Sequence, residues 1–194
     1  MIVYSIQTDK ANKKIFVMPP MNNKNRVGDI DDFDTGIKKS GNWVPPSVEW
    51  FDDDGRDLNK YKDPDISYIS VPSSLIVSPY TQELIAHAVK DVAELLPIPF
   101  NNEAWYLLNV HNIIDAVDKE NCKYNIRRNG EIGRMLKVAF FAEKIPHAKL
   151  FTVPEKRSTY YFAEHHPDNS ENNFKHIVEK NNLFGIEFVK VWEG

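Results

Sequence analysis

Cysteine is almost absent from the sequence, because Cys122 is the only one among 194 residues. A chain with one cysteine forms no internal disulfide and no cysteine-rich zinc site. Lys119 and Lys123 stand near Cys122 and would favour its thiolate form. Catalysis by a cysteine also needs an oriented base, however, and the sequence indicates none. We therefore expect a buried or half-buried thiol without a catalytic role.

Long apolar runs are also missing. No segment approaches the roughly 20 residues that an apolar helix needs to cross a bilayer. The beginning of the sequence lacks the basic start and the apolar core of a secretion signal. We therefore expect a cytoplasmic protein that does not contact a membrane. Hydrophobic residues make up 42% of the chain and charged residues 27%, a balance typical of a globular fold.

An excess of basic residues is missing as well, since the formal net charge is −4. This balance argues against nucleic-acid binding, which usually requires a basic surface. The charge is uneven along the chain: residues 29–65 contain eleven acidic and five basic residues, a net charge of −6. This acidic segment would repel a phosphate backbone and could attract a basic protein surface.

Motifs for cofactors and metals are not found. There is no glycine-rich phosphate loop, no nucleophile elbow and no HExxH sequence. The most ligand-like cluster is His165, His166 and Asp168. Adjacent histidines on a strand point to opposite faces, and the spacings of known zinc motifs are absent. We expect an exposed loop at this cluster, with no bound metal and no cofactor.

Two groups of acidic residues resemble functional sites only in part. Asp52, Asp53 and Asp54 precede a glycine, but a calcium loop needs alternating acids and a closing glutamate. Asp115 and Asp118 could act as an acid–base pair only across a turn, because a spacing of three on a strand directs them to opposite faces. We expect Asp118 to start a turn and Asp115 to bond the nearby backbone.

The clearest helix signal lies between residues 78 and 96. Ser78 is a good N-cap, and Pro79 suits the first helical position. Apolar residues then recur at helical spacing: Leu84, Ile85, Ala88, Val89, Val92, Leu95 and Leu96. Since Pro97 and Pro99 would stop a helix, the sequence predicts a helix over 79–96.

Strand signals are more numerous than helix signals. The strongest are 105–110 and 113–117, which we expect to pack against the helix after a turn at Asn101 and Asn102. A hairpin is predicted from 2–6 and 15–18, and a second helix over 170–181. Further strands are predicted at 66–71, 75–77, 124–128, 135–141, 149–153, 159–163 and 183–192, the last with Gly185 at its entry. Runs of strands without strict alternation favour an α+β fold with a mostly antiparallel sheet.

The chain is predicted to form a single domain over 1–194, with two parts of different character. Residues 1–65 would hold the hairpin and an irregular acidic segment, and residues 66–194 the main α+β body. The irregular segment contains isolated aromatics, among them Trp43, Trp50 and Phe51. A long irregular segment is uncommon in a compact domain unless it is functional or mobile.

Six short segments in a fixed order resemble a known family. They are Pro64–Ile66, Leu75–Ser78, Trp105–Val110, Ile114–Asp118, Leu150–Phe151 and Leu183–Phe188. This order resembles the immunity proteins of bacterial polymorphic toxin systems, in the family numbered eleven of that scheme, formerly a domain of unknown function. Within the resemblance, Ser78, Asn109, Asp115, Asp118 and Gly185 are the structural positions. Cys122 stands where the family often has a serine.

The resemblance implies a non-enzymatic protein that binds and neutralises a cognate bacterial toxin. On this hypothesis the contact surface is the acidic segment with its aromatics: Asp52, Asp53, Asp54, Trp50, Phe51 and Trp43. Acidic groups would steer a toxin with a basic contact surface, and a central aromatic would hold it.

Two alternatives stay open. One is a small hydrolase that uses His165, His166 and Asp168 together with Asp115 or Asp118. The other is an adaptor protein whose partner is not a toxin. A homodimer is also compatible with the sequence.

Overall fold

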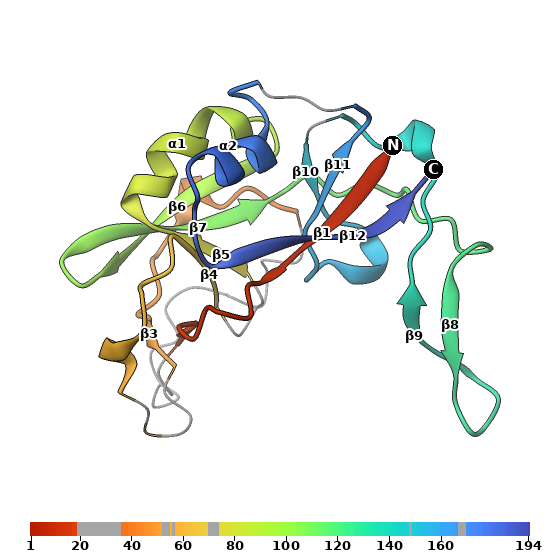
Figure 1. Cartoon of the computed structure of the whole chain (residues 1–194), viewed down its shortest axis with the longest axis horizontal. Coiled ribbons are helices and arrows are strands. Elements are labelled where there is room, and N and C mark those ends of the chain that lie inside the picture. Colours follow the sequence, from red (N-terminus) through yellow and green to blue (C-terminus); the bar gives the residue numbers. More distant parts are fainter. Residues whose placement is uncertain (19–35, 52–54, 56, 70–73, 148, 167–169) are drawn as a thin grey trace.

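The computed structural model describes residues 1–18, 36–51, 55, 57–69, 74–147, 149–166 and 170–194. In these ranges the chain forms twelve strands and two α-helices, with sheets of six, four and two strands (Figure 1). Every strand pair in these sheets is antiparallel except the one that joins Phe16 to Ile69. The predicted α+β class with a mostly antiparallel sheet is confirmed.

The six-stranded sheet contains the centre of the fold. In spatial order its strands are β3 (Glu49–Trp50), β2 (Phe16–Val17), β4 (Ile66–Ile69), β5 (Ser74–Val77), β7 (Glu103–Val110) and β6 (Ala93–Phe100). Both faces are covered, because Leu107 and Leu108 are adjacent on β7, point to opposite faces and are both buried. Helix α1 (Pro79–Val89) packs on the Leu108 face.

The first helix is shorter than predicted. Ser78 caps it as expected, and its hydroxyl accepts a hydrogen bond of 3.2 Å from the backbone N–H of Thr81. Residues 93–96, however, are the start of β6, and Pro97 and Pro99 lie within this strand. An edge strand tolerates prolines. Asn101 and Asn102 both have positive φ angles, 50° and 64°, which suits the two-residue turn of a hairpin with β7.

The four-stranded sheet contains β10 (Leu150–Phe151), β11 (Tyr161–Glu164), β1 (Ile2–Thr8) and β12 (Ile186–Glu193), in this order. The predicted hairpin of 2–6 with 15–18 is therefore wrong, since β1 pairs with the C-terminal strands and β2 belongs to the other sheet. The link between them contains a turn, in which the backbone N–H of Asn12 donates to the carbonyl of Asp9, and the backbone N–H of Asp9 donates to the carbonyl of Gly185 before β12. Pairings between distant segments leave no local signal.

Two further predicted elements change in the structure. Helix α2 (Phe174–Lys180) starts later than residue 170, because the side chain of Asn173 caps it by accepting from the backbone N–H of His176 at 3.0 Å. The predicted strand 113–117 contributes only isolated bridges, from Ile113 to Thr152 and from Val117 to Phe140. This segment packs with the four-stranded sheet and not with β7.

Gly185 joins the two large sheets at the entry of β12. Its φ angle is +124°, and a Cβ atom there would lie 1.9 Å from the carbonyl oxygen of Ile66. The neighbouring carbonyl of Phe184 accepts hydrogen bonds from the backbone N–H groups of Asp65 and Ile66. Any side chain at this glycine would therefore separate β12 from the start of β4.

Candidate functional site

A two-stranded hairpin stands away from the rest of the molecule (Figure 1). It is formed by β8 (Lys123–Ile126) and β9 (Ile132–Lys137), and we call residues 123–137 the arm. The tip is a tight turn. The backbone N–H of Gly130 donates to the carbonyl of Arg127, and the backbone N–H of Arg127 donates to the carbonyl of Glu131, both at 2.9 Å. Among the described residues, neither strand of the arm pairs with another sheet.

The arm exposes large apolar side chains. Ile132 is 70% exposed, Ile126 64% and Leu136 59%, the three highest values among the large hydrophobic residues that the structure describes. Ile126 and Ile132 are cross-strand partners, so they form one patch near the tip. Apolar side chains grouped on a projecting element are typical of a protein contact surface.

The arm is also strongly basic. Its five basic residues are Lys123, Arg127, Arg128, Arg134 and Lys137. Glu131 is its only acidic residue, so the arm carries a net charge of +4 in a chain with a net charge of −4. A surface of this sign would attract an acidic partner.

The base of the arm is anchored in the core. Tyr124 pairs with Met135 across the strands, and Met135 packs against the buried cluster beside the four-stranded sheet. Cys122 lies at the same base, where its Sγ atom accepts a hydrogen bond of 3.3 Å from the backbone N–H of Ala139. The half-buried Cys122 thus has a structural contact, and the arm is held at its root although its tip is free.

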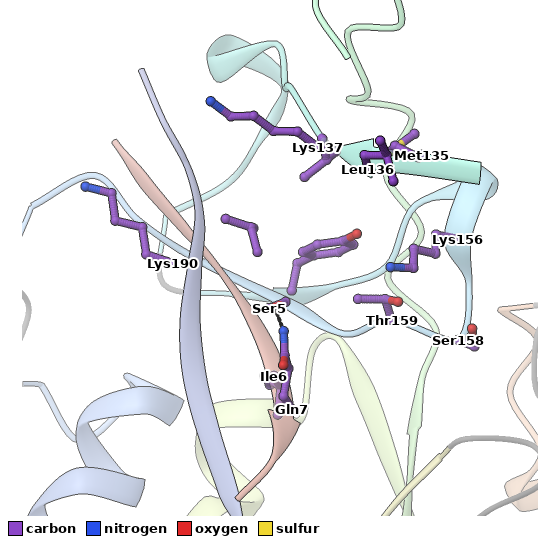
Figure 2. A pocket seen from close by; sticks show the side chains of 13 residues that line it. Ser5, Ile6, Gln7, Met135, Leu136, Lys137, Lys156, Ser158, Thr159 and Lys190 are labelled. Atoms are coloured by element: carbon purple, nitrogen blue, oxygen red, sulfur yellow. Dashed lines mark hydrogen bonds between the residues drawn. The ribbon is translucent and has the colours of Figure 1, made fainter. Parts of the chain in front are cut away.

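A cavity of about 490 Å³ opens between the base of the arm and the four-stranded sheet, and we call it the basal cavity. Figure 2 shows its lining, which includes Lys137 at the end of β9, Lys156 and Thr159 from the turn before β11, and Lys190 from β12. Tyr161 forms part of the wall, and burial raises the pKa of its hydroxyl to about 12. This phenol therefore stays neutral at physiological pH and can donate a hydrogen bond.

Two of the three aromatic residues predicted for partner binding, Trp43 and Trp50, are half-buried against the six-stranded sheet. Trp50 stacks on Phe16 with ring centroids 4.0 Å apart, and both contact Phe100 and Trp105. We call these four residues the aromatic cluster. It covers the Leu107 face of the six-stranded sheet.

The other residues of the predicted contact surface differ in how far they are exposed. Trp43 donates from its indole Nε1 to the carbonyl of Pro97 at 2.7 Å. Phe51 is partly open, with 38% of its surface exposed. Asp52, Asp53 and Asp54 lie outside the described residues. The structure thus brings Trp50 and Trp43 onto one sheet face and gives them packing roles there.

Asn109 fastens the acidic segment to the main body. Its buried amide donates to Glu94 at 3.0 Å and to the carbonyl of Ile37 at 3.1 Å. The Glu94 carboxylate also accepts from the backbone N–H of Lys39 at 2.6 Å. Burial opposes ionisation of Glu94, but the hydrogen bonds from Ser40, Lys39 and Asn109 outweigh it and hold the pKa of this carboxyl below its ordinary value.

The two aspartates of the possible acid–base pair have separate surroundings. Asp118 starts a turn, as predicted, because its carboxylate accepts from the backbone N–H and the side-chain amide of Asn121. Asp115 is exposed to solvent. Neither arrangement resembles a general base held beside a nucleophile.

The histidines of the predicted cluster lie at another cavity. His165 and His166 help to line a space of about 450 Å³ together with Glu164, Lys175 and His176. The imidazole Nε2 of His165 lies 2.9 Å from the carbonyl oxygen of Ile145. The ring of His147 lies 4.3 Å from that of His166, measured between centroids. Asp168 lies outside the described residues.

Histidine, cysteine and carboxylate side chains do not gather in groups of three or more around a common metal position anywhere in the described ranges. No helix in the described part of the chain has the length and apolarity that a bilayer crossing requires. The sequence matches no known family model and no curated protein.

The arm is the feature that sequence reasoning missed as a surface. The sequence predicts strands at 124–128 and 135–141 but not their pairing, and the structure places them earlier, at Lys123–Ile126 and Ile132–Lys137. Asn129-Gly130 between two apolar–basic runs is a typical hairpin signal. Only the structure shows that Ile126 and Ile132 face solvent.

Proposed function

We propose that the protein is a non-enzymatic immunity protein that acts in the cytoplasm by binding a toxin protein in a stoichiometric complex. The arm is the observation that carries this proposal. It combines an exposed isoleucine pair with a net charge of +4 on an element that stands clear of the body. Apolar anchors inside a charged rim are typical of protein–protein contacts.

The toxin as the partner follows from the resemblance in the order of six segments, which runs over roughly residues 60–192. The arm favours an acidic surface on the toxin, whereas the segment 29–65 with its net charge of −6 favours a basic one. Both contacts can belong to one complex, because the arm and the acidic segment are separate parts of the chain.

Co-expression with a candidate toxin, sought among the genes that neighbour this one, tests the proposal. We expect protection of the cell only when the protein is at least equimolar to the toxin, and a stable complex on size-exclusion chromatography. His165→Ala and His166→Ala should protect as well as the unmodified chain. Protection at clearly substoichiometric amounts, lost on either histidine substitution, would instead support the hydrolase alternative.

An adaptor function is the second candidate, since the arm would serve any acidic partner protein. Toxin activity in a purified mixture distinguishes an adaptor from an immunity protein. An adaptor would leave toxin activity unchanged in a purified mixture, whereas the proposed immunity protein abolishes it at an equimolar ratio.

A further inference from the structure

We propose that the basal cavity is a binding site for an organic phosphate, a small molecule with a multiply charged phosphate group and a less polar body. This site shares Met135, Leu136 and Lys137 with the base of the arm but does not include the Ile126 and Ile132 pair near the tip. It is carried by the charge of the lining and the size of the space.

The residues that line the cavity carry positive charges and no negative charge. Three of its thirteen residues are lysines, Lys137, Lys156 and Lys190, and none is an aspartate or a glutamate. Among the described residues, neither Lys137 nor Lys156 forms an ion pair. Three lysines in one lining, two of them without an ion pair among the described residues, favour an anionic ligand in a chain with a net charge of −4.

Two carboxylates that are close to these lysines in the sequence form ion pairs. Glu155 precedes Lys156 in the chain but pairs with Lys119 at 3.0 Å. Lys190 pairs with Glu193, and both side chains are about half exposed. An exposed pair of this kind contributes little, so the Lys190 ammonium can exchange Glu193 for a bound anion.

One of the three lysines points into the cavity, and the other two stand at its rim. In Figure 2 the Lys156 side chain extends towards the centre of the cavity, and Thr159 lies beside it. Lys137 and Lys190 extend outwards at the rim. Their flexible four-carbon stems can bring the ammonium groups back over the mouth when an anion is present.

A tight turn presents three of the lining residues, of which Lys156 and Ser158 are exposed and Thr159 is half-buried. The backbone N–H of Thr159 donates to the carbonyl of Lys156 at 3.1 Å, and that of Lys156 donates to Val153 at 3.1 Å. Lys156, Ser158 and Thr159 are thus presented from one short stretch. An ammonium and two hydroxyls are the donors that phosphate oxygens accept from.

Size and charge distinguish the ligand class. A space of about 490 Å³ is larger than a single carboxylate side chain needs and falls in the range of small-molecule sites, roughly 300–1,000 Å³. Three lysines match a multiply charged phosphate better than a carboxylate with one charge. Ile6, Val138 and Val191 give part of the lining an apolar character that suits an organic body.

Titration of ¹⁵N-labelled protein with inorganic phosphate, inorganic pyrophosphate and ADP, followed by NMR at constant ionic strength, tests this site. We expect saturable shifts at residues 5–7, 137–138, 156–159 and 190–191. Pyrophosphate and ADP should bind more tightly than inorganic phosphate. Lys156→Met should weaken pyrophosphate binding at least tenfold, and Thr159→Val should weaken it less.

Lys180→Met is the matched control, because Lys180 is an exposed lysine outside the basal cavity. It should leave the affinity unchanged, and circular dichroism should show the same fold for every variant. Shifts that do not saturate, or that Lys180→Met reduces as much as Lys156→Met, would overturn the site. Toxin protection by Lys156→Met is predicted to be intact, which separates this proposal from the proposed function.

Discussion

The arm and the aromatic cluster both present large apolar side chains next to charged residues, yet they differ in what covers those side chains. In the aromatic cluster, Trp50 and Phe16 stack on each other and lie against β7. On the arm, Ile126 and Ile132 are cross-strand partners and face solvent.

The difference follows from the supporting structure. Strand β3 brings Trp50 onto a sheet face that already needs covering, so its burial stabilises the fold. The arm has two strands and no second layer, and a hairpin of this size is marginal on its own. Exposed apolar groups there contribute little to folding, which is why we propose them as the partner contact.

The largest predicted effect concerns the sheet beneath the aromatic cluster. Leu107→Ala and Leu108→Ala should each lower the free energy of unfolding by about 2–5 kcal/mol, because each leaves a cavity in a different buried face. Urea denaturation followed by circular dichroism measures this. If only one of the two substitutions destabilised the protein, one sheet face would be open to solvent.

Trp50→Ala should come next. The ring is half-buried, so we expect a loss of about 2–3 kcal/mol, less than the roughly 3–5 kcal/mol typical of a fully buried aromatic. Phe51→Ala is the control, because the Phe51 side chain is more exposed than that of Trp50. This substitution should change the free energy of unfolding by less than about 1 kcal/mol. Equal effects of the two substitutions in thermal unfolding would mean that the aromatic cluster does not support the fold.

Charge reversal on the arm should act on association and not on stability. Arg127→Glu with Arg128→Glu should slow toxin association about tenfold at low salt, and high salt should remove much of the difference. Surface plasmon resonance measures the association rate at low and at high salt.

The acidic segment is tested in the same assay by one variant that combines Asp52→Lys, Asp53→Lys and Asp54→Lys. If only this triple variant slowed association, the steering charge would lie there and not on the arm.

The smallest effect is expected at Glu94. Glu94→Gln should cost about 0.5–1.5 kcal/mol at neutral pH, because three groups donate to the carboxylate. The pKa of Glu94 is lowered by folding, so its contribution is present above the unfolded pKa and is lost as pH falls through the folded pKa. The stability difference between the two proteins should therefore shrink in acid. Denaturant titrations at neutral and at acidic pH measure this. A stability difference that stays the same at both pH values would contradict the role given to the Glu94 carboxylate.

The sequence predicted the local features well. The Ser78 cap, the Asn101-Asn102 turn and strand β7 are each encoded by neighbouring residues, and all three are found. The end of α1 was not predictable in the same way. Leu95 and Leu96 fit a helical stripe, but hairpin formation with β7 places them in a strand.

Long-range pairing explains the other differences. The partners of β1 lie more than 150 residues away in β11 and β12, and no pattern near Ile2–Thr8 indicates them. The candidate site is recognised by which apolar side chains are exposed, and the sequence alone does not show whether an isolated apolar residue is buried or exposed. Trp50 and Ile126 both lie beside charged residues, and only the sheets around them determine that the first is packed and the second exposed.

The dissociation constant of the toxin complex, measured by isothermal titration calorimetry, tests the central claim most directly. Ile126→Ser with Ile132→Ser should weaken the complex at least tenfold, which is about 1.4 kcal/mol, while the melting temperature stays nearly unchanged. Tyr80→Ser is the matched control, since Tyr80 is 55% exposed on α1, away from the arm. Unchanged affinity for the folded double variant, or an equal loss for Tyr80→Ser, would contradict the assignment of the arm as the partner-binding surface.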